Sequence, residues 1–130
     1  MRGVKLMINV TPINDNESLS DFCAKNGIEF LENRGVTVAK DGEAILGFCA
    51  YILNNNCITI THLSPEDDVM LADGILRSAL HIADFRGITN AFYTDTAPVK
   101  LFSLLGFIKS DEEKALKIEK LHESCCSCGK

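Results

Sequence analysis

Apolar and polar residues alternate with a period of two in the first half of the chain, which is typical of half-buried strands. Residues 5–10 predict a short strand that ends at Thr11-Pro12, because proline disfavours helical geometry in the residue before it. Residues 35–42 alternate and finish on Asp-Gly, a turn typical of hairpins. The almost wholly apolar range 44–53 predicts a central strand, and residues 57–63, rich in β-branched side chains, predict the next one.

Apolar residues at helical spacing follow the first strand and return after this meander. The first such run predicts an amphipathic helix that begins at Asn16 or Ser18 and closes at Gly27. Ser64 is expected to cap a long helix over residues 65–85, with proline and acidic residues in its first turn. The apolar stripe of this helix predicts that it packs on a sheet.

The last third of the chain contains shorter elements. Residues 88–93 predict a strand, and residues 99–105 predict a short helix that Gly106 closes. The segment after Ser110 fits both a strand and a helix, and we favour a closing strand over residues 115–121. The pattern as a whole predicts a single domain over residues 1–124 and a cysteine-rich tail over residues 125–130.

Composition and charge exclude several classes of function. The 130 residues suit one domain, and 46% hydrophobic with 24% charged residues is a globular balance. A formal net charge of −5 gives no basic field for phosphates, so we expect neither nucleic acid nor a membrane surface as partner. The longest apolar run is about half of the roughly 20 residues that a membrane-spanning helix needs. Because the N-terminal apolar patch is also short for a signal peptide, we expect a cytoplasmic protein.

The cysteines fall into two groups. They stand at positions 23, 49, 57, 125, 126 and 128. The first three lie within apolar segments, where a reduced cysteine behaves as a small hydrophobic residue. The Cys125-Cys126-Ser127-Cys128 tail, with His122 nearby, offers soft ligands that suit zinc or a redox response. A single Cys-x-x-Cys pair at a chain end also fits an exposed tail without such a role, and we assign no metal site.

The element order and three local motifs resemble those of the GNAT acyl-CoA N-acyltransferases. Thr61-His62-Leu63-Ser64-Pro65 is similar to the end of the family's fourth strand, and residues 77–87 are similar to the back half of the helix that follows. Leu105-Gly106-Phe107 matches the family's C-terminal signature. The resemblance implies an α/β (α+β) fold with a twisted, mixed, mostly antiparallel sheet and helices on both faces. It also implies transfer of an acetyl or related acyl group from coenzyme A to a small-molecule or peptide amine, with a homodimer as one arrangement.

The resemblance places acetyl-CoA between two diverging strands, with its diphosphate at the start of the long helix. Two departures bear on that site. Residues 66–72 have neither the glycines nor the arginine of the family's phosphate loop, and Ala72 alone matches its last small position. Three carboxylates stand there instead and would repel a diphosphate by about 1 kcal/mol for each close pair in water. Phe102 replaces the tyrosine that protonates the leaving thiolate, and phenylalanine has no proton to give.

Several residues remain as candidates for the reaction that the resemblance implies. His62 suits a base that takes a proton from the amine, and the alternative is a histidine whose hydrogen bonds are satisfied within the sheet. Tyr93 is a substitute acid or a packing residue. Cofactor contacts are expected from four positions, which are Leu63, Ser64, Ala72 and Asp95. Glu43 is a further carboxylate at a predicted turn.

Three functions therefore remain open at this level. The first is the acyltransferase. The second is a GNAT-like binding or regulatory module whose coenzyme A site is lost or altered, as the acidic helix start and Phe102 suggest. The third is a thiol- or metal-responsive module that acts through the tail. The carboxylates predict weak binding of acetyl-CoA, with a dissociation constant on the order of 1 mM or worse.

Overall fold

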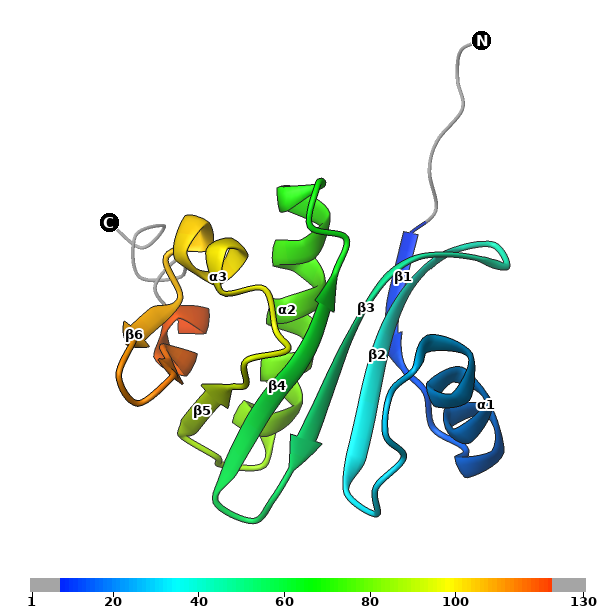
Figure 1. The fold of residues 1–130 in the computed structure, drawn as a ribbon, viewed down its shortest axis with the longest axis horizontal. Coiled ribbons are helices and arrows are strands. Elements are labelled where there is room, and N and C mark those ends of the chain that lie inside the picture. The colour runs from blue at the N-terminus through cyan, green and yellow to red at the C-terminus, as the bar shows by residue number, and fades with distance from the viewer. Residues whose placement is uncertain (1–7, 123–130) are drawn as a thin grey trace, which may run out of the picture.

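The described part of the chain forms one seven-stranded sheet, in the strand order β1-β2-β3-β4-β5-β7-β6 (Figure 1). This computed structural model describes residues 8–122. Neighbouring strands are antiparallel except β4 and β5, which run parallel. The elements are β1 (Ile8–Pro12), α1 (Asn16–Asn26), β2 (Arg34–Asp41), β3 (Ala44–Leu53), β4 (Cys57–Ser64), α2 (Val69–Phe85), β5 (Asn90–Tyr93), α3 (Val99–Leu105), β6 (Ile108–Ser110), β7 (Ala115–Leu116) and a 3-10 turn, η1 (Ile118–His122).

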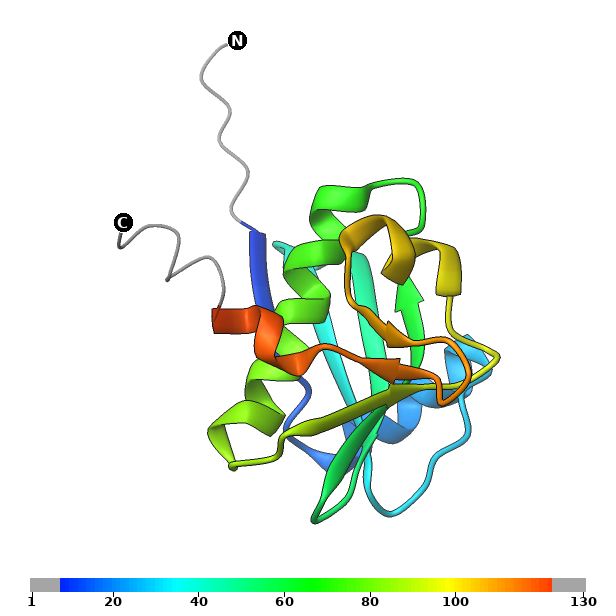
Figure 2. The ribbon, with the colours of Figure 1, turned by 90° about the vertical axis from the view of Figure 1, so that its left-hand side faces the viewer.

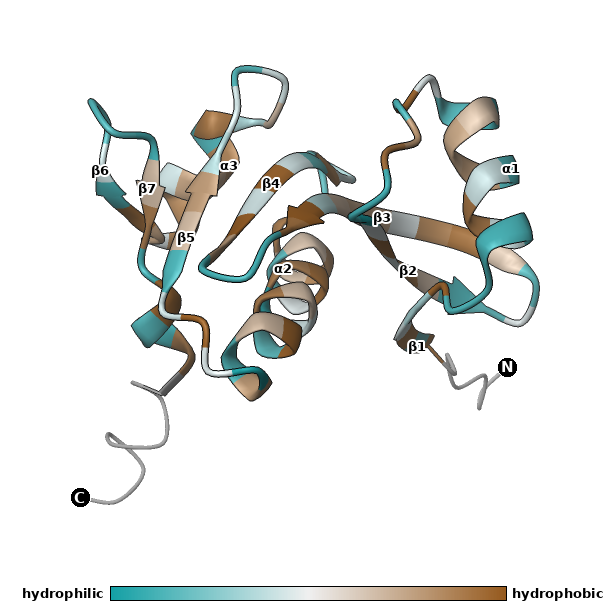
Figure 3. Cartoon of the chain, turned by 90° about the horizontal axis from the view of Figure 1, so that it is seen from below, coloured by the Kyte–Doolittle hydropathy of each residue, from teal (hydrophilic) through white to brown (hydrophobic). Residues whose placement is uncertain are grey.

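Helices cover both faces of this mixed, mostly antiparallel sheet, as predicted. Figure 3 shows α1 on one face of the strands and α2 on the other. Strand β2 separates the two cores because its side chains alternate: Val36 and Val38 join the cluster under α1, whereas Ala39 joins the cluster under α2. The α1 face and the α2 face are named for these helices below.

The first two elements differ from the prediction at their ends. Strand β1 contains Pro12, which pairs with Thr37, because an edge strand tolerates a residue without an amide proton. The predicted residues 5–7 lie outside the described part. Helix α1 is capped by Asp15, not by Asn16 or Ser18, since its side chain accepts a hydrogen bond of 3.0 Å from the amide of Ser18.

The long helix begins later than predicted. Ser64 is the last residue of β4, where it pairs with Phe48, so it does not cap α2. Asp68 is the cap and accepts a hydrogen bond of 3.2 Å from the amide of Leu71. The acidic residues therefore precede the helix and do not form its first turn. At the other end, β5 starts at Asn90 because the amide of Ile88 is bonded back to α2.

The predicted closing strand over residues 115–121 is wrong for most of its length. Only Ala115 and Leu116 pair in the sheet, next to β5 and β6. Ile118 and Leu121 then lie in η1, and both are buried in the α2-face core. A spacing of three residues places both side chains on one side of a 3-10 turn, whereas strand alternation would separate them.

The first three cysteines are free thiols in the structure, and two of them are buried. Cys23 lies in the α1-face core and Cys49 in the α2-face core, while Cys57 is half-buried. The tail over residues 125–130 and its proposed metal or redox role lie outside the described residues. Within residues 8–122, no helix combines the length and the apolar character needed to cross a bilayer.

Candidate functional site

Strands β4 and β5, in the middle of the sheet, pair over only part of the length of β4. Their parallel pairing ends where Ile60 faces Tyr93, although β4 continues to Ser64. Thr61 is the extra residue of an irregularity against β3, because Ala50 pairs with His62 and the next residue of β3 pairs with Ile60. The end of β4 beyond this bulge leads through residues 65–68 to the start of α2, with α3, gold in Figure 2, beside it.

Two threonines of the turn after β5 reach back to β4. The amide of Thr94 donates a hydrogen bond of 3.1 Å to the carbonyl of Ile60. The hydroxyl of Thr96 donates one of 2.8 Å to the carbonyl of Thr61. The opening between the strands is therefore bridged as far as Thr61, and the main chain from His62 to Ser64 lies beyond that bridge.

The end of β4 is held against β3 by a close approach at Gly47. A Cβ atom built on this glycine would lie 2.5 Å from the carbonyl oxygen of Ser64 and 2.6 Å from Cδ of Pro65. It would also lie 2.8 Å from Cδ1 of Ile75 in α2. Glycine at this position thus allows β3, the end of β4 and α2 to meet.

His62 forms a hydrogen-bonded network with two polar residues that are almost fully buried. Its Nδ1 lies 2.9 Å from Oγ1 of Thr61. The guanidinium of Arg34 donates to the same oxygen over 2.6 Å, and Thr61 Oγ1 donates to the carbonyl of Ala50 over 3.1 Å. Burial, and secondly the charge of Arg34, lower the pKa of His62. A neutral imidazole near pH 7 follows, and this is the form that accepts a proton.

The predicted acid, Tyr93, does not lie next to His62. Tyr93 is buried with its ring against Phe102, the centroids 5.3 Å apart, in the α2-face core. His62 pairs with Ala50 of the α1-face core, so it projects from the opposite face of the sheet. Phe102 is fully buried, and it occupies the position of the tyrosine that the resemblance implies.

The predicted cofactor contacts occupy different surroundings. Leu63 is buried in the α2-face core, and Ala72 is buried in α2 with its amide bonded to the carbonyl of Asp68. Asp95 is exposed in the turn after β5 and forms an ion pair of 3.1 Å with Lys114. Glu43 is exposed between β2 and β3, and is not brought to the site.

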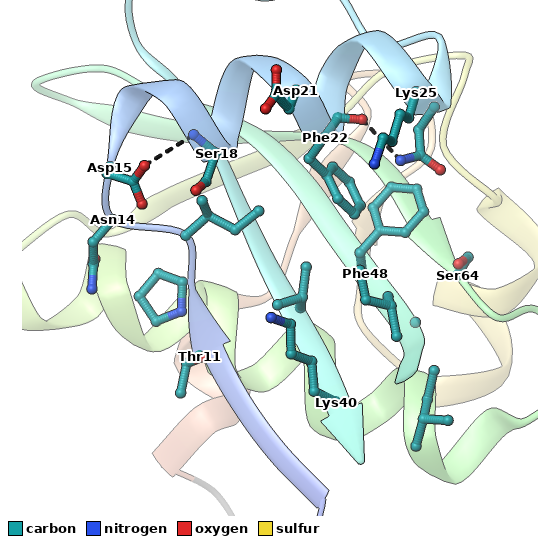
Figure 4. Close-up of a pocket in the computed structure, with 17 residues that line it drawn as sticks. Thr11, Asn14, Asp15, Ser18, Asp21, Phe22, Lys25, Lys40, Phe48 and Ser64 are labelled. Carbon is teal, nitrogen blue, oxygen red and sulfur yellow. Dashed lines mark hydrogen bonds between the residues drawn. The ribbon is translucent and has the colours of Figure 1, made fainter. Parts of the chain in front are cut away.

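A cavity of about 700 Å³ opens on the α1 face beside the end of β4. Its walls come from α1, the segment before it, and strands β1 to β4, with Phe22 and Phe48 edge to face at their centroid distance of 5.0 Å (Figure 4). Ser64 lines the cavity at the side of β4. The charged residues on its walls are of both signs, and they are Asp15, Asp21, Lys25 and Lys40. Such walls suit a polar molecule with an apolar portion.

No group of three histidine, cysteine, aspartate or glutamate residues within residues 8–122 could hold a metal ion. The acids at the start of α2 are consequently best described by what they do to the helix. Asp68 caps it, and Glu66 and Asp67 stand before it.

Comparison with known proteins identifies the fold. No protein-family model and no curated protein matches the sequence. The solved structure of a putative acetyltransferase of the GNAT family from Desulfovibrio desulfuricans superimposes with a TM-score of 0.56, covering 80% of this chain and 86% of that chain at 10% sequence identity. The chain has a GNAT-like fold. At this identity the likeness concerns architecture, so the activity must be argued from the site.

Sequence reasoning missed three residues that shape the site. Arg34 could have been noticed as a charged residue at the start of a segment in which apolar and polar residues alternate. Thr96 carried no signal, since a turn threonine is ordinary. Gly47 was visible as the one interruption in the apolar run over residues 44–53, which is where a close backbone approach is expected.

Proposed function

We propose that the protein is a GNAT-like N-acyltransferase that moves an acetyl or related acyl group from coenzyme A to an amine. The observation that carries the proposal is the end of the parallel β4–β5 pairing at Ile60 and Tyr93, while β4 continues to Ser64. The unpaired side of an extended strand can pair with an extended ligand, as the pantetheine arm would be. The cavity on the α1 face, which Ser64 lines, would hold the amine.

The residues present support a simple sequence of proton and bond changes. The amine nitrogen attacks the thioester carbonyl carbon, a C–N bond forms, the C–S bond breaks, and His62 takes the proton of the amine. The thiolate leaves and takes a proton from water, because Phe102 cannot supply one. Thiols are acidic enough, as the pKa near 8.5 of an ordinary cysteine illustrates, for a thiolate to be a good leaving group, so the missing tyrosine would slow the reaction without abolishing it.

Substitution of His62 tests this proposal. We expect His62→Gln to lower the rate of amine acetylation by about 100- to 1,000-fold, because the proton acceptor is removed. The measurement is mass-spectrometric detection of acylated product with millimolar acetyl-CoA and a panel of small amines and peptides. His81→Gln is the matched control, since His81 is exposed on α2, and it should retain full activity.

The same assay has an expected dependence on pH. Because the pKa of His62 lies below its ordinary value of 6.5, kcat/KM should rise with pH through an apparent pKa below that value and then level off. Activity is lost as the pH falls, since the protonated imidazole accepts nothing. An acetylation rate equal in wild type and His62→Gln at every pH would contradict the role of this residue.

A second candidate function is suggested by two other features of the site. The hydroxyl of Thr96 is bonded to the carbonyl of Thr61, where an incoming arm would begin to pair, and Phe102 fills the acid position. These features would suit a GNAT-like binding module without catalysis. Binding of a ligand in the cavity, with no acylated product for any amine at millimolar acetyl-CoA, would select this function over the first.

A further inference from the structure

The hydroxyl of Thr61 stands at the centre of three hydrogen bonds. Its oxygen lies 2.6 Å from Nη1 of Arg34 and 2.9 Å from Nδ1 of His62. It also lies 3.1 Å from the carbonyl oxygen of Ala50 in β3. Thr61 is almost fully buried, and it is the residue of the β4 bulge, which turns its side chain toward these partners.

The proton inventory of this group settles which atoms donate. A hydroxyl has one proton and two lone pairs. The hydroxyl donates its proton to the carbonyl of Ala50, which can only accept, and a guanidinium can only donate, so Arg34 occupies one lone pair. The remaining lone pair faces Nδ1 of His62. With the hydroxyl proton on the carbonyl of Ala50, Nδ1 must carry a proton, because two lone pairs facing each other would repel.

We propose that Thr61 is a positioning residue that holds neutral His62 in the Nδ1–H tautomer, so that Nε2 is the atom that accepts the proton of the acceptor amine. This inference rests on the proposed acyltransferase function for its consequence in catalysis. The tautomer itself is a property of the folded chain and can be measured without any substrate.

Arg34 makes the arrangement rigid. Its side chain is anchored at the other end by a hydrogen bond of 3.0 Å from Nε to the carbonyl of Glu29, and only 7% of the residue is exposed. A fixed positive charge on the far side of the hydroxyl disfavours a second positive charge on the ring. Arg34 therefore acts on His62 in two ways, through the orientation of Thr61 and through its charge.

His62 lies on the same face of the sheet as the cavity, although it is not one of the residues that line it. His62 pairs with Ala50 and Ser64 pairs with Phe48, and both partners belong to or pack against the α1-face core. The two β4 residues thus share a face and are about 7 Å apart along the strand. Because Ser64 lines the cavity, an amine that extends from it along β4 would reach the histidine from the α1 face.

Nitrogen-15 NMR of the histidine rings tests the proposal directly. Protonated and unprotonated ring nitrogens give well-separated signals, and His62→Gln identifies which signals belong to this ring. In wild type near pH 7.5 we expect a protonated Nδ1 and an unprotonated Nε2. In Thr61→Val, which keeps the shape and removes the hydroxyl, we expect both tautomers; Thr61→Ser is the matched control that keeps the wild-type pattern.

Two results of the NMR experiment would contradict the proposal. An unprotonated Nδ1 in wild type, or an unchanged tautomer in Thr61→Val, would overturn it. If Thr61→Val fails to fold, as thermal melting would show, the wild-type and Thr61→Ser spectra still decide the tautomer. In the acetylation assay, Thr61→Val should lose about 10- to 100-fold in kcat with little change in KM for acetyl-CoA.

The two proposals can fail separately. Absence of acetylation by wild type with the Nδ1–H tautomer present would refute the acyltransferase and leave the positioning role of Thr61 standing. Acetylation that requires His62, with the opposite tautomer, would refute the positioning role and leave the acyltransferase standing.

Discussion

Replacing Gly47 by alanine is expected to lower the free energy of unfolding by about 3 kcal/mol, at the upper end of the usual cost of overpacking. The added Cβ would meet the carbonyl oxygen of Ser64 at 2.5 Å and the ring of Pro65 at 2.6 Å. Neither neighbour can move alone, since one is backbone and the other is a closed ring. Strand β3 must therefore move away from the end of β4, and the side chain of Ile75 in α2 must also shift. Urea denaturation of wild type and variant measures the loss.

Gly74→Ala is the matched control because it adds the same methyl group to a glycine without a clash. A Cβ built on Gly74 has nothing within 4 Å, and the residue is exposed within α2. Alanine there should stabilise the protein by about 0.5–1 kcal/mol, which is the helix-propensity difference between the two residues. Equal stability of Gly47→Ala and wild type would show that β3 and β4 do not approach as described.

Exchanging the acids before α2 for residues of the family's phosphate loop should tighten acetyl-CoA binding about 10- to 100-fold. The double variant Asp67→Arg, Asp68→Gly removes two negative charges from the helix start and adds one positive charge, each change about 1 kcal/mol in water against a nearby phosphate. Wild type should bind with a dissociation constant on the order of 1 mM or worse. Titration calorimetry at moderate salt measures both proteins.

A control variant at a distant pair of acids distinguishes the effect of local charge on affinity from the effect of net charge. Asp111→Arg, Glu112→Gly makes the same net change in the exposed turn between β6 and β7 and should leave the affinity unchanged. Losing the Asp68 cap should cost only a few tenths of a kcal/mol, since glycine is tolerated there. Micromolar binding by wild type would contradict this account of the carboxylates and strengthen the acyltransferase.

The fold could be predicted from the sequence wherever local pattern and tertiary structure agree. Strand β3 was predicted with its observed bounds because Ala44–Leu53 is apolar between two turns. The start of α2 was placed too early, because Ser64 has the chemistry of a cap, but pairing with Phe48 keeps it in the sheet. The strand predicted over residues 115–121 was wrong for a related reason. Burial of Ile118 and Leu121 against the core favours a 3-10 turn, although the local pattern also fits a strand.

The candidate site was less predictable because its geometry depends on contacts between distant segments. His62 was recognised from its place at a strand end, but its partners were not. Arg34 lies 27 residues before Thr61 in sequence, and only the pairing of β2, β3 and β4 brings them together. The position of Tyr93 on the other face of the sheet required the register of β4 and β5, which no local pattern encodes.

The two faces of the sheet bury different numbers of side chains, and this difference determines which part of the molecule unfolds locally first. Among the residues that the structure describes, the α2-face core contains 22 buried residues, whereas the α1-face core contains seven. Local unfolding follows the weaker packing, so α1 should lose its protection from hydrogen exchange before α2 does. Because α1 also forms one wall of the cavity, whatever occupies that cavity would restrain these openings, and its affinity would include the entropy of ordering the helix.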